Sequence, residues 1–254
     1  MRKLMFNGRR SVDFGVKISG EDPFGAPARI TQAVTIPGRN GAFIIDEGNY
    51  ENKEKIYHSA AFRTENLPET AAAIKAWLMQ DGLYHRLEDN YDPEVFRLAR
   101  FAGAFETELI GTGGRSMRFD LVFDCMPQTF LKSGERELFI SAETGYGLFH
   151  NPTGFRAWPQ IRLYPTAAGS YTAKIEEVDG GAEFGRVTFT PLTMQREIIF
   201  DTETTEAWYA DTGESANDRV SASGDLSLPD DTRRISLVEE TAGGLSIIPR
   251  WWRL

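Results

Sequence analysis

The sequence contains little of what disulfides, metal sites and membrane spans are built from. Cys125 is the only cysteine among 254 residues, so no intrachain disulfide and no site with several thiolate ligands can form. The three histidines, His58, His85 and His150, do not share the spacing of a zinc motif. No apolar run approaches the roughly 18 residues that a membrane-spanning helix needs, and the N-terminal stretch lacks the apolar core of a signal peptide. We therefore expect a protein that is made and folded in the cytosol, without membrane association.

Positive charge is scarce as well. The 28 Lys and Arg residues are outnumbered by 37 Asp and Glu residues, which gives a net charge of −9. Residues 133–254 account for most of it, with 11 basic against 19 acidic side chains, whereas residues 1–132 carry 17 against 18. A chain this acidic repels phosphate backbones, and it has no basic stripe with interleaved aromatics. We expect no gripping of nucleic acid.

Signatures of catalysis are missing too. The pattern around Cys125 places it on the apolar face of a strand, which favours a core residue over a nucleophile. The glycine-rich segment 111–116 links two expected strands and lacks the lysine that a phosphate-binding loop requires. The acidic residues within 201–206 fall where a solvated hairpin turn is expected. No nucleophile-elbow, zinc-protease or serine–lysine motif occurs, so we expect no enzyme and no metal or cofactor. A carboxylate pair for glycoside hydrolysis stays open, because any two strands can bring such a pair together.

One stretch does predict a helix, over about residues 67–80. Asn66 can cap its first turn, Pro68 suits that turn, and Gly82 can close its C-terminus. Apolar side chains recur with the spacing of a single helix face, at Ala71, Ile74, Trp77 and Leu78.

The remaining sequence alternates apolar and polar residues with period two. This holds over residues 12–18 and most clearly over residues 117–125, and short runs of the same kind recur through the second half. The pattern predicts a mainly β protein, with a first part that carries the helix and an all-β second part of sandwich or barrel type. Polar and glycine character interrupts the strands at residues 128–137, so we expect domains at 1–132 and 133–254.

Residues 34–46 indicate a β-hairpin. Asn40-Gly41 can supply the two positive φ angles of a type I′ turn, with β-branched residues before it and an apolar run after it. Pro37 cannot donate a ladder hydrogen bond, so this arm belongs at a sheet edge or projects from the sheet. An apolar run on a projecting hairpin would expose a surface of the kind that usually marks an interface.

The tryptophans gather in the second half, at Trp158, Trp208, Trp251 and Trp252. Core or interface positions are favoured over a platform for sugar rings, because large aromatics dominate cores and interfaces. Adjacent strand residues point to opposite faces, so only one of Trp251 and Trp252 can fill the core. We expect residues 249–254 to be a final strand pinned into the second domain, with Arg250 or Arg253 stacked on the outer tryptophan.

Three motifs together resemble the distal tail protein family of long-tailed, non-contractile bacteriophages. The first is the hairpin with its acidic-aromatic continuation, the second is Asn-Pro-Thr at 151–153, and the third is the closing Pro-Arg-Trp-Trp-x-Leu. The matching residues of the first are Val34, Ile36, Pro37, Gly38, Arg39, Gly41, Tyr50, Glu51 and Asn52. Those of the third are Pro249, Arg250, Trp251, Trp252 and Leu254.

This resemblance implies an N-terminal split β-barrel with one helix and a C-terminal galectin-like β-sandwich. It further implies a structural virion protein at the tail tip: a homohexameric ring that joins the tail tube to the tail-associated hub and, in many phages, to receptor-binding or baseplate proteins. DNA would pass through its channel without being gripped. The candidate interface residues are Ile36, Pro37, Arg39, Asn40, Phe43, Ile44 and Tyr50.

Two other functions stay open at this point. The second domain could be a carbohydrate-binding module that recognises host cell-surface glycans, and such a role could coexist with a ring. A glycoside hydrolase or esterase would need convergent carboxylates or a nucleophile that the sequence does not nominate.

Overall fold

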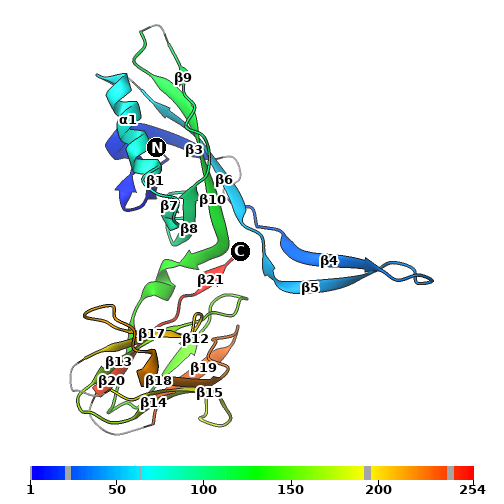
Figure 1. The fold of residues 1–254 in the computed structure, drawn as a ribbon, viewed down its shortest axis with the longest axis vertical. Helices are drawn as coiled ribbons and strands as arrows, with labels where there is room; N and C mark the ends of the chain where they lie inside the picture. The colour runs from blue at the N-terminus through cyan, green and yellow to red at the C-terminus, as the bar shows by residue number, and fades with distance from the viewer. Residues whose placement is uncertain (1, 21–23, 63, 112, 192–195, 239–242) are drawn as a thin grey trace. The chain divides into compact units, whose positions relative to one another are not determined.

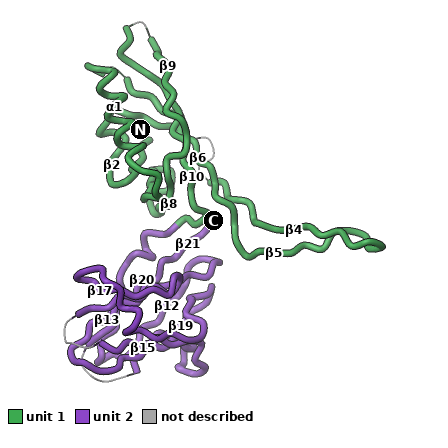
Figure 2. The backbone as a smooth tube through the Cα atoms, in the orientation of Figure 1, with its two compact units in different colours: residues 1–129, 254 green, residues 130–253 purple. Residues whose placement is uncertain are grey.

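The computed structural model describes residues 2–20, 24–62, 64–111, 113–191, 196–238 and 243–254 (Figure 1). Over these residues the chain is mainly β with one α-helix, as the sequence predicts. It divides into two compact units, which are residues 1–129 with Leu254 (unit 1) and residues 130–253 (unit 2; Figure 2). That the two parts are separately folding domains with a boundary after residue 132 stays a prediction.

The main sheet of unit 1 is open and runs in the order β2-β1-β7-β8-β10-β6-β3, with β9 and β21 also paired to β10. The strands of this sheet in unit 1 are β1 (Leu4–Phe6), β2 (Arg9–Arg10), β3 (Val16–Gly20), β6 (Lys53–Ala61), β7 (His85–Asp89), β8 (Val95–Phe101), β9 (Glu108–Leu109) and β10 (Met117–Leu131). The last two residues of β10 and the short strand β21 (Trp252–Arg253) belong to unit 2 (Figure 2). The two remaining strands of unit 1, β4 (Arg29–Thr35) and β5 (Ala42–Tyr50), form a separate two-stranded sheet.

The longest strand, β10, organises the core of unit 1. Every second side chain from Met117 to Cys125 is buried, so the predicted alternation is confirmed and decides which face of the sheet is inside. The antiparallel partner β6 pairs with it from Met117↔Ala61 to Cys125↔Lys53. The buried face packs against the helix, which supplies Ile74, Trp77 and Leu78 to the same core.

The helix α1 spans Leu67–Leu78, and its start is the predicted one. The backbone N–H of Glu69 donates to the side chain of Asn66 at 3.3 Å, which satisfies one of the free donors of the first turn. Its end differs from the prediction, because the C-terminal cap is Met79 and the helix ends before Gly82. The indole of Trp77 donates to the carbonyl of Phe6 at 2.9 Å, which ties the helix to β1.

The expected strand over residues 12–18 is half wrong. Residues 11–14 form a 3₁₀ turn, η1 (Ser11–Phe14), and only Val16–Gly20 is extended. Asp13 accepts the backbone N–H of Arg10 at 3.3 Å, and Gly15 follows with φ 68°. A side chain that accepts a hydrogen bond from the nearby backbone, next to a glycine with positive φ, favours a turn over a strand. The alternation of apolar and polar residues does not reveal this.

Unit 2 is a sandwich of two five-stranded antiparallel sheets that share one apolar core. One sheet has the order β11-β20-β13-β16-β17, made of β11 (Leu138–Ser141), β20 (Gly243–Ile248), β13 (Gln160–Pro165), β16 (Ile198–Asp201) and β17 (Glu206–Tyr209). The other has the order β12-β19-β14-β15-β18, made of β12 (Tyr146–His150), β19 (Thr232–Leu237), β14 (Tyr171–Glu176), β15 (Glu183–Phe189) and β18 (Val220–Gly224). Short 3₁₀ turns lie at η2 (Lys132–Glu135) and η3 (Asn217–Arg219).

Candidate interaction surface

The hairpin of β4 and β5 is the least buried part of unit 1. Its strands pair with each other and with no other strand of the described residues (Figure 1). All residues from 31 to 49 are exposed, among them the candidate interface residues Ile36, Pro37, Arg39, Asn40, Phe43 and Ile44, whereas Tyr50 is half-buried. A two-stranded hairpin is marginal by itself in water, so an arm of this length gains from a partner.

The turn of this hairpin differs from the predicted type I′ turn at Asn40-Gly41. The backbone N–H of Arg39 donates to the carbonyl of Ile36 at 3.1 Å, and Gly38 has φ 82°. Proline at the second position and a left-handed glycine at the third are the marks of a type II turn. Pro37 therefore lies in the turn rather than in the arm. Asn40 is not left-handed, and Gly41, with φ 80°, reverses the chain into β5.

The two faces of the hairpin differ in apolar content. Val34 pairs with Phe43 and Gln32 with Ile45, which places Val34, Phe43 and Ile45 on one face. These three side chains are 41%, 50% and 43% exposed, and Ile36, two residues beyond Val34, is 42% exposed. We name Val34, Ile36, Phe43 and Ile45 the apolar hairpin face. Ile44 lies on the opposite face, opposite Ala33.

Charged and polar side chains brace the hairpin near its base. The guanidinium of Arg29 pairs with Asp46 at 2.6 Å and donates to the hydroxyl of Tyr50 at 2.9 Å. The hydrogen bond from Arg29 lowers the pKa of Asp46. Tyr50, expected at an interface, therefore belongs to an intrachain contact in this structure, and its role between copies stays a prediction.

Asn52 ties the end of the hairpin to the main sheet. Its side-chain amide donates to the hydroxyl of Tyr84 at 2.7 Å and to Asp124 at 2.9 Å. The carboxylate of Asp124 also accepts hydrogen bonds from the hydroxyl of Tyr84 at 3.0 Å and from the guanidinium of Arg100 at 2.9 Å. Burial raises the pKa of Asp124, but the hydrogen bonds from Arg100, Asn52 and Tyr84 outweigh it, so the pKa lies below its usual range. This network holds the chain where β5 gives way to β6.

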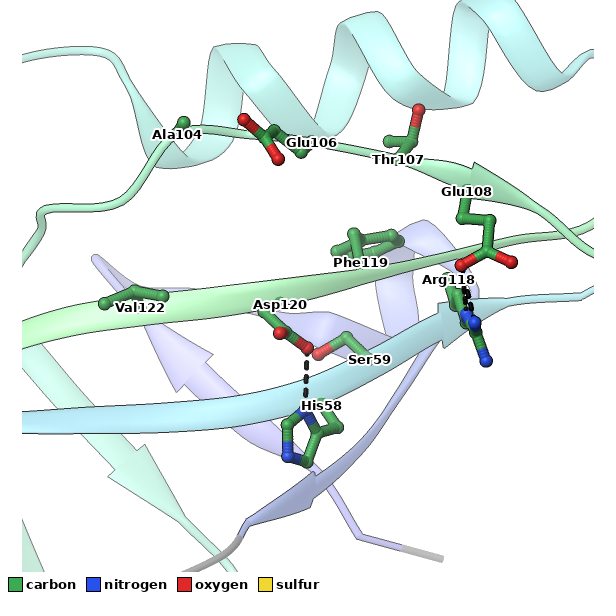
Figure 3. A pocket seen from close by; sticks show the side chains of 10 residues that line it. All are labelled: His58, Ser59, Ala104, Glu106, Thr107, Glu108, Arg118, Phe119, Asp120 and Val122. Carbon is green, nitrogen blue, oxygen red and sulfur yellow. Dashed lines mark hydrogen bonds and ion pairs between the residues drawn. The ribbon is translucent and has the colours of Figure 1, made fainter.

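A groove of about 790 Å³ opens on unit 1 between β6 and β10 on one side and residues 104–108 on the other (Figure 3). Three carboxylates line it, from Glu106, Glu108 and Asp120, against one guanidinium, from Arg118. Arg118 donates to Glu108 at 2.7 Å, and the imidazole of His58 bonds Asp120 at 2.7 Å. With the imidazole neutral, the groove is acidic.

The groove holds Ser59, His58 and Asp120, yet it is not a hydrolase triad. The Ser59 hydroxyl donates to the carbonyl of Tyr57 at 3.0 Å and has no hydrogen bond to His58. Adjacent strand residues point to opposite faces, so His58 cannot serve Ser59 as a base. The His58–Asp120 pair follows from the pairing of β6 with β10 across 62 residues, which no local sequence signal reveals.

A buried polar cluster lies beneath the sheet of unit 1. Asp89 accepts the hydroxyl of Tyr57 at 2.5 Å and pairs with Lys55 at 3.4 Å. Burial raises the pKa of Tyr57 and lowers that of Lys55. Burial also raises the pKa of Asp89, but Tyr57 and Lys55 outweigh it and hold the pKa low. Cys125 is only 2% exposed and burial raises its pKa to about 11, so the thiol is a core group as predicted.

Two of the three family motifs meet inside unit 2. Asn151, 3% exposed, accepts the backbone N–H and hydroxyl of Thr153 and donates to the carbonyls of Phe155 and Leu228. The ring of Phe155 then packs on Trp252 with centroids 4.6 Å apart. The Asn-Pro-Thr motif thus shapes a loop that receives the closing motif.

The closing motif is not one continuous strand, which corrects the expectation for residues 249–254. β20 ends at Ile248, Arg250 has φ 56°, and only Trp252–Arg253 form β21. Arg250 forms a bidentate pair with Asp201, both distances 2.7 Å, and donates to the carbonyl of Trp158 at 2.6 Å. A non-glycine residue accepts a left-handed backbone at a cost, which these three hydrogen bonds offset.

The expectation that one tryptophan faces inward is correct. Trp251 is 6% exposed within the sandwich core, and Trp252 is half-buried. The outer ring rests on Phe155, and Arg250 bonds Asp201 and the carbonyl of Trp158. That Arg253 stacks on the outer ring stays a prediction. Asp201 was expected in a solvated turn, but it is 8% exposed and holds Arg250. Pro249 is buried as well.

In the described part of the chain, no three or more His, Cys, Asp or Glu side chains lie close enough together to bind a metal ion. His85 bonds Asp81 and His150 bonds Thr232, so the three histidines lie in three separate places. Within the same residues, no helix has the length and apolar character to cross a membrane.

Comparison with known proteins gives matches of structure and none of sequence. No family model and no curated protein matches the chain. The crystal structure of the phage SPP1 Dit protein, described as a paradigm of the hub adsorption apparatus in phages that infect Gram-positive bacteria, superposes with a TM-score of 0.69 and 14% identity over 97% of each chain. A chain of the phage P2 baseplate in its activated conformation with Ca gives a TM-score of 0.57 and 9% identity, also over 97% of each. The resemblance indicated by the sequence motifs is thus confirmed in structure: the chain has the fold of a phage distal tail protein over essentially its whole length.

Proposed function

We propose that this chain is a non-enzymatic distal tail protein, a structural component of the virion at the tip of a phage tail. The observation that carries the proposal is a fold shared over 97% of both chains with the SPP1 Dit protein, combined with a hairpin whose apolar side chains no described residue covers. An exposed apolar patch of this kind usually marks the binding site of a partner.

In this proposal the partner of the hairpin is a second copy of the chain. A head-to-tail contact between two different surfaces closes into a ring when the rotation permits, and six copies form the proposed ring. The ring would join the tail tube to the tail-associated hub and to receptor-binding or baseplate proteins, and DNA would cross it during ejection. The net charge of −9 supports passage without gripping, since few phosphate contacts can form.

The test is self-assembly of the purified full chain, alone and with its tube and hub partners, by light scattering and negative-stain microscopy. Six-membered rings are expected. Phe43→Asp puts a carboxylate on the apolar hairpin face, and we expect it to abolish assembly without changing the fold. Leu83→Asp makes the same chemical change at a side chain that is 67% exposed outside the hairpin, and it should assemble normally. A wild-type chain that stays monomeric under all these conditions contradicts the proposal.

The carbohydrate-binding alternative gains no platform from the tryptophans of unit 2. Trp251 is buried, and Trp158, Trp208 and Trp252 are half-buried, whereas a platform for sugar rings needs an exposed aromatic face. Glycan-array binding by the intact protein, lost when one of these side chains is replaced, would restore this candidate.

A further inference from the structure

The tip of the hairpin carries a charge with no partner of its own. Arg39 is exposed within the turn, and its side chain makes no hydrogen bond or ion pair in the described part of the chain. Beside it stand Ile36, 42% exposed, and Pro37, also exposed. The tip therefore presents one cation next to a small apolar surface on a type II turn.

The groove of Figure 3 presents the opposite pattern. Glu108 and Asp120 already have partners in Arg118 and His58, whereas the side chain of Glu106 has none among the described residues. Val122 and Ala104 give the same groove an apolar part. Its volume of about 790 Å³ lies within the roughly 300–1,000 Å³ of sites that enclose sizeable ligands, so it has room for several side chains.

We propose that the hairpin tip of one copy enters this groove of the next copy, with Arg39 beside Glu106 and Ile36 against Val122. This inference rests on the proposed ring and names the surface that receives the hairpin. The tip does not occupy the groove of its own copy, because every residue of the turn is exposed.

The two surfaces lie on different parts of unit 1, so their contact is head-to-tail, as a ring requires. Charge sets the partner and the register of such a contact more than its strength. An exposed ion pair contributes little, so Arg39→Ala should weaken assembly by at most about fivefold. Reversing either charge brings like charges together, and each reversal should raise the protein concentration needed for assembly by at least about tenfold.

The decisive experiment uses Arg39→Glu and Glu106→Arg in the full-length protein, alone and mixed. Each variant alone should fail to assemble at concentrations where the wild type forms rings. In a one-to-one mixture, the reversed tip of the first variant meets the reversed groove of the second, and the native tip of the second meets the native groove of the first. Every contact in an alternating ring is then matched, so the mixture should assemble, and a ring of six allows this alternation. The double variant Arg39→Glu, Glu106→Arg should also assemble alone.

Controls with the same charge changes elsewhere on unit 1 are Arg9→Glu and Glu94→Arg, both at exposed residues, and they should leave assembly unchanged. If either reversal at the proposed contact assembles like the wild type, or if the mixture stays dissociated, the inference is overturned. If Phe43→Asp still abolishes the rings in that case, the proposed ring survives and only the groove is wrong. A wild-type chain that never assembles overturns both proposals.

Discussion

The bidentate pair of Arg250 with Asp201 is predicted to be the ion pair on which unit 2 depends most. Arg250→Met retains an aliphatic side chain and the unfavourable left-handed backbone conformation at this position. It removes three hydrogen bonds. Breaking a fully buried pair costs about 3–5 kcal/mol, whereas an exposed pair contributes about 0.2–1 kcal/mol. The side chains of Arg250 and Asp201 are 24% and 12% exposed, and Asp201 keeps the backbone N–H of Glu203 at 2.9 Å. The free energy of unfolding should therefore fall by about 2–3 kcal/mol.

Urea unfolding followed by tryptophan fluorescence measures this change, since four of the five tryptophans lie in residues 130–253. The matched control is Arg196→Met, which removes pairs to Asp211 and Glu214 at exposed positions and should cost less than about 1 kcal/mol. A double-mutant cycle with Asp201→Asn should give a coupling energy of about 1–2 kcal/mol. The reasoning is refuted if Arg250→Met costs no more than Arg196→Met, or if the cycle is additive within about 0.5 kcal/mol.

Two further predictions concern buried groups in the two cores. Trp251→Ala should lower the free energy of unfolding by about 3–5 kcal/mol, because the ring is 6% exposed in the sandwich core. Trp252→Ala should lower it clearly less, because Trp252 is half-buried. Urea unfolding measures both changes, and equal values would contradict this prediction. Burial raises the pKa of the Cys125 thiol in the folded protein to about 11, whereas the ordinary pKa of a thiol in an unfolded chain is 9.0. The contribution of this thiol to the free energy of unfolding is therefore complete below pH 9 and is lost as the pH rises towards 11. Cys125→Ala should then make stability fall less steeply between pH 9 and pH 11. If the fall is unchanged, other groups such as Tyr57 cause it.

Much of the local structure follows from the sequence. The alternation of residues 117–125 predicts both the strand β10 and its buried face, since period two distinguishes the two faces of a sheet. The start of α1 at Asn66 and the existence of the hairpin are also predicted by local signals. These features depend on residues within one turn or one strand of each other.

Features that depend on distant residues are not predictable in this way. The hairpin turn is misassigned because Pro37-Gly38 and Asn40-Gly41 are both good turn signals, and only the pairing of Thr35 with Ala42 decides between them. The backbone bend at Arg250 depends on Asp201, 49 residues away, which the local sequence assigns to a solvated turn. The groove likewise requires the register of β6 on β10, so its acidic character is invisible until that pairing is known.

The position of Trp251 in the sandwich core has a consequence for synthesis on the ribosome. About 120 residues separate the end of β10 from Trp251, and at about 5–20 residues per second their translation takes roughly 6–25 s. During that interval all of the residues that build the core of unit 1 have been made, whereas the sandwich still lacks β20 and its largest inward-facing ring. The hairpin with its uncovered apolar side chains is thus present from an early stage, while unit 2 is still unfinished. In the proposed ring, the hairpin surface of each copy is therefore complete before its sandwich is.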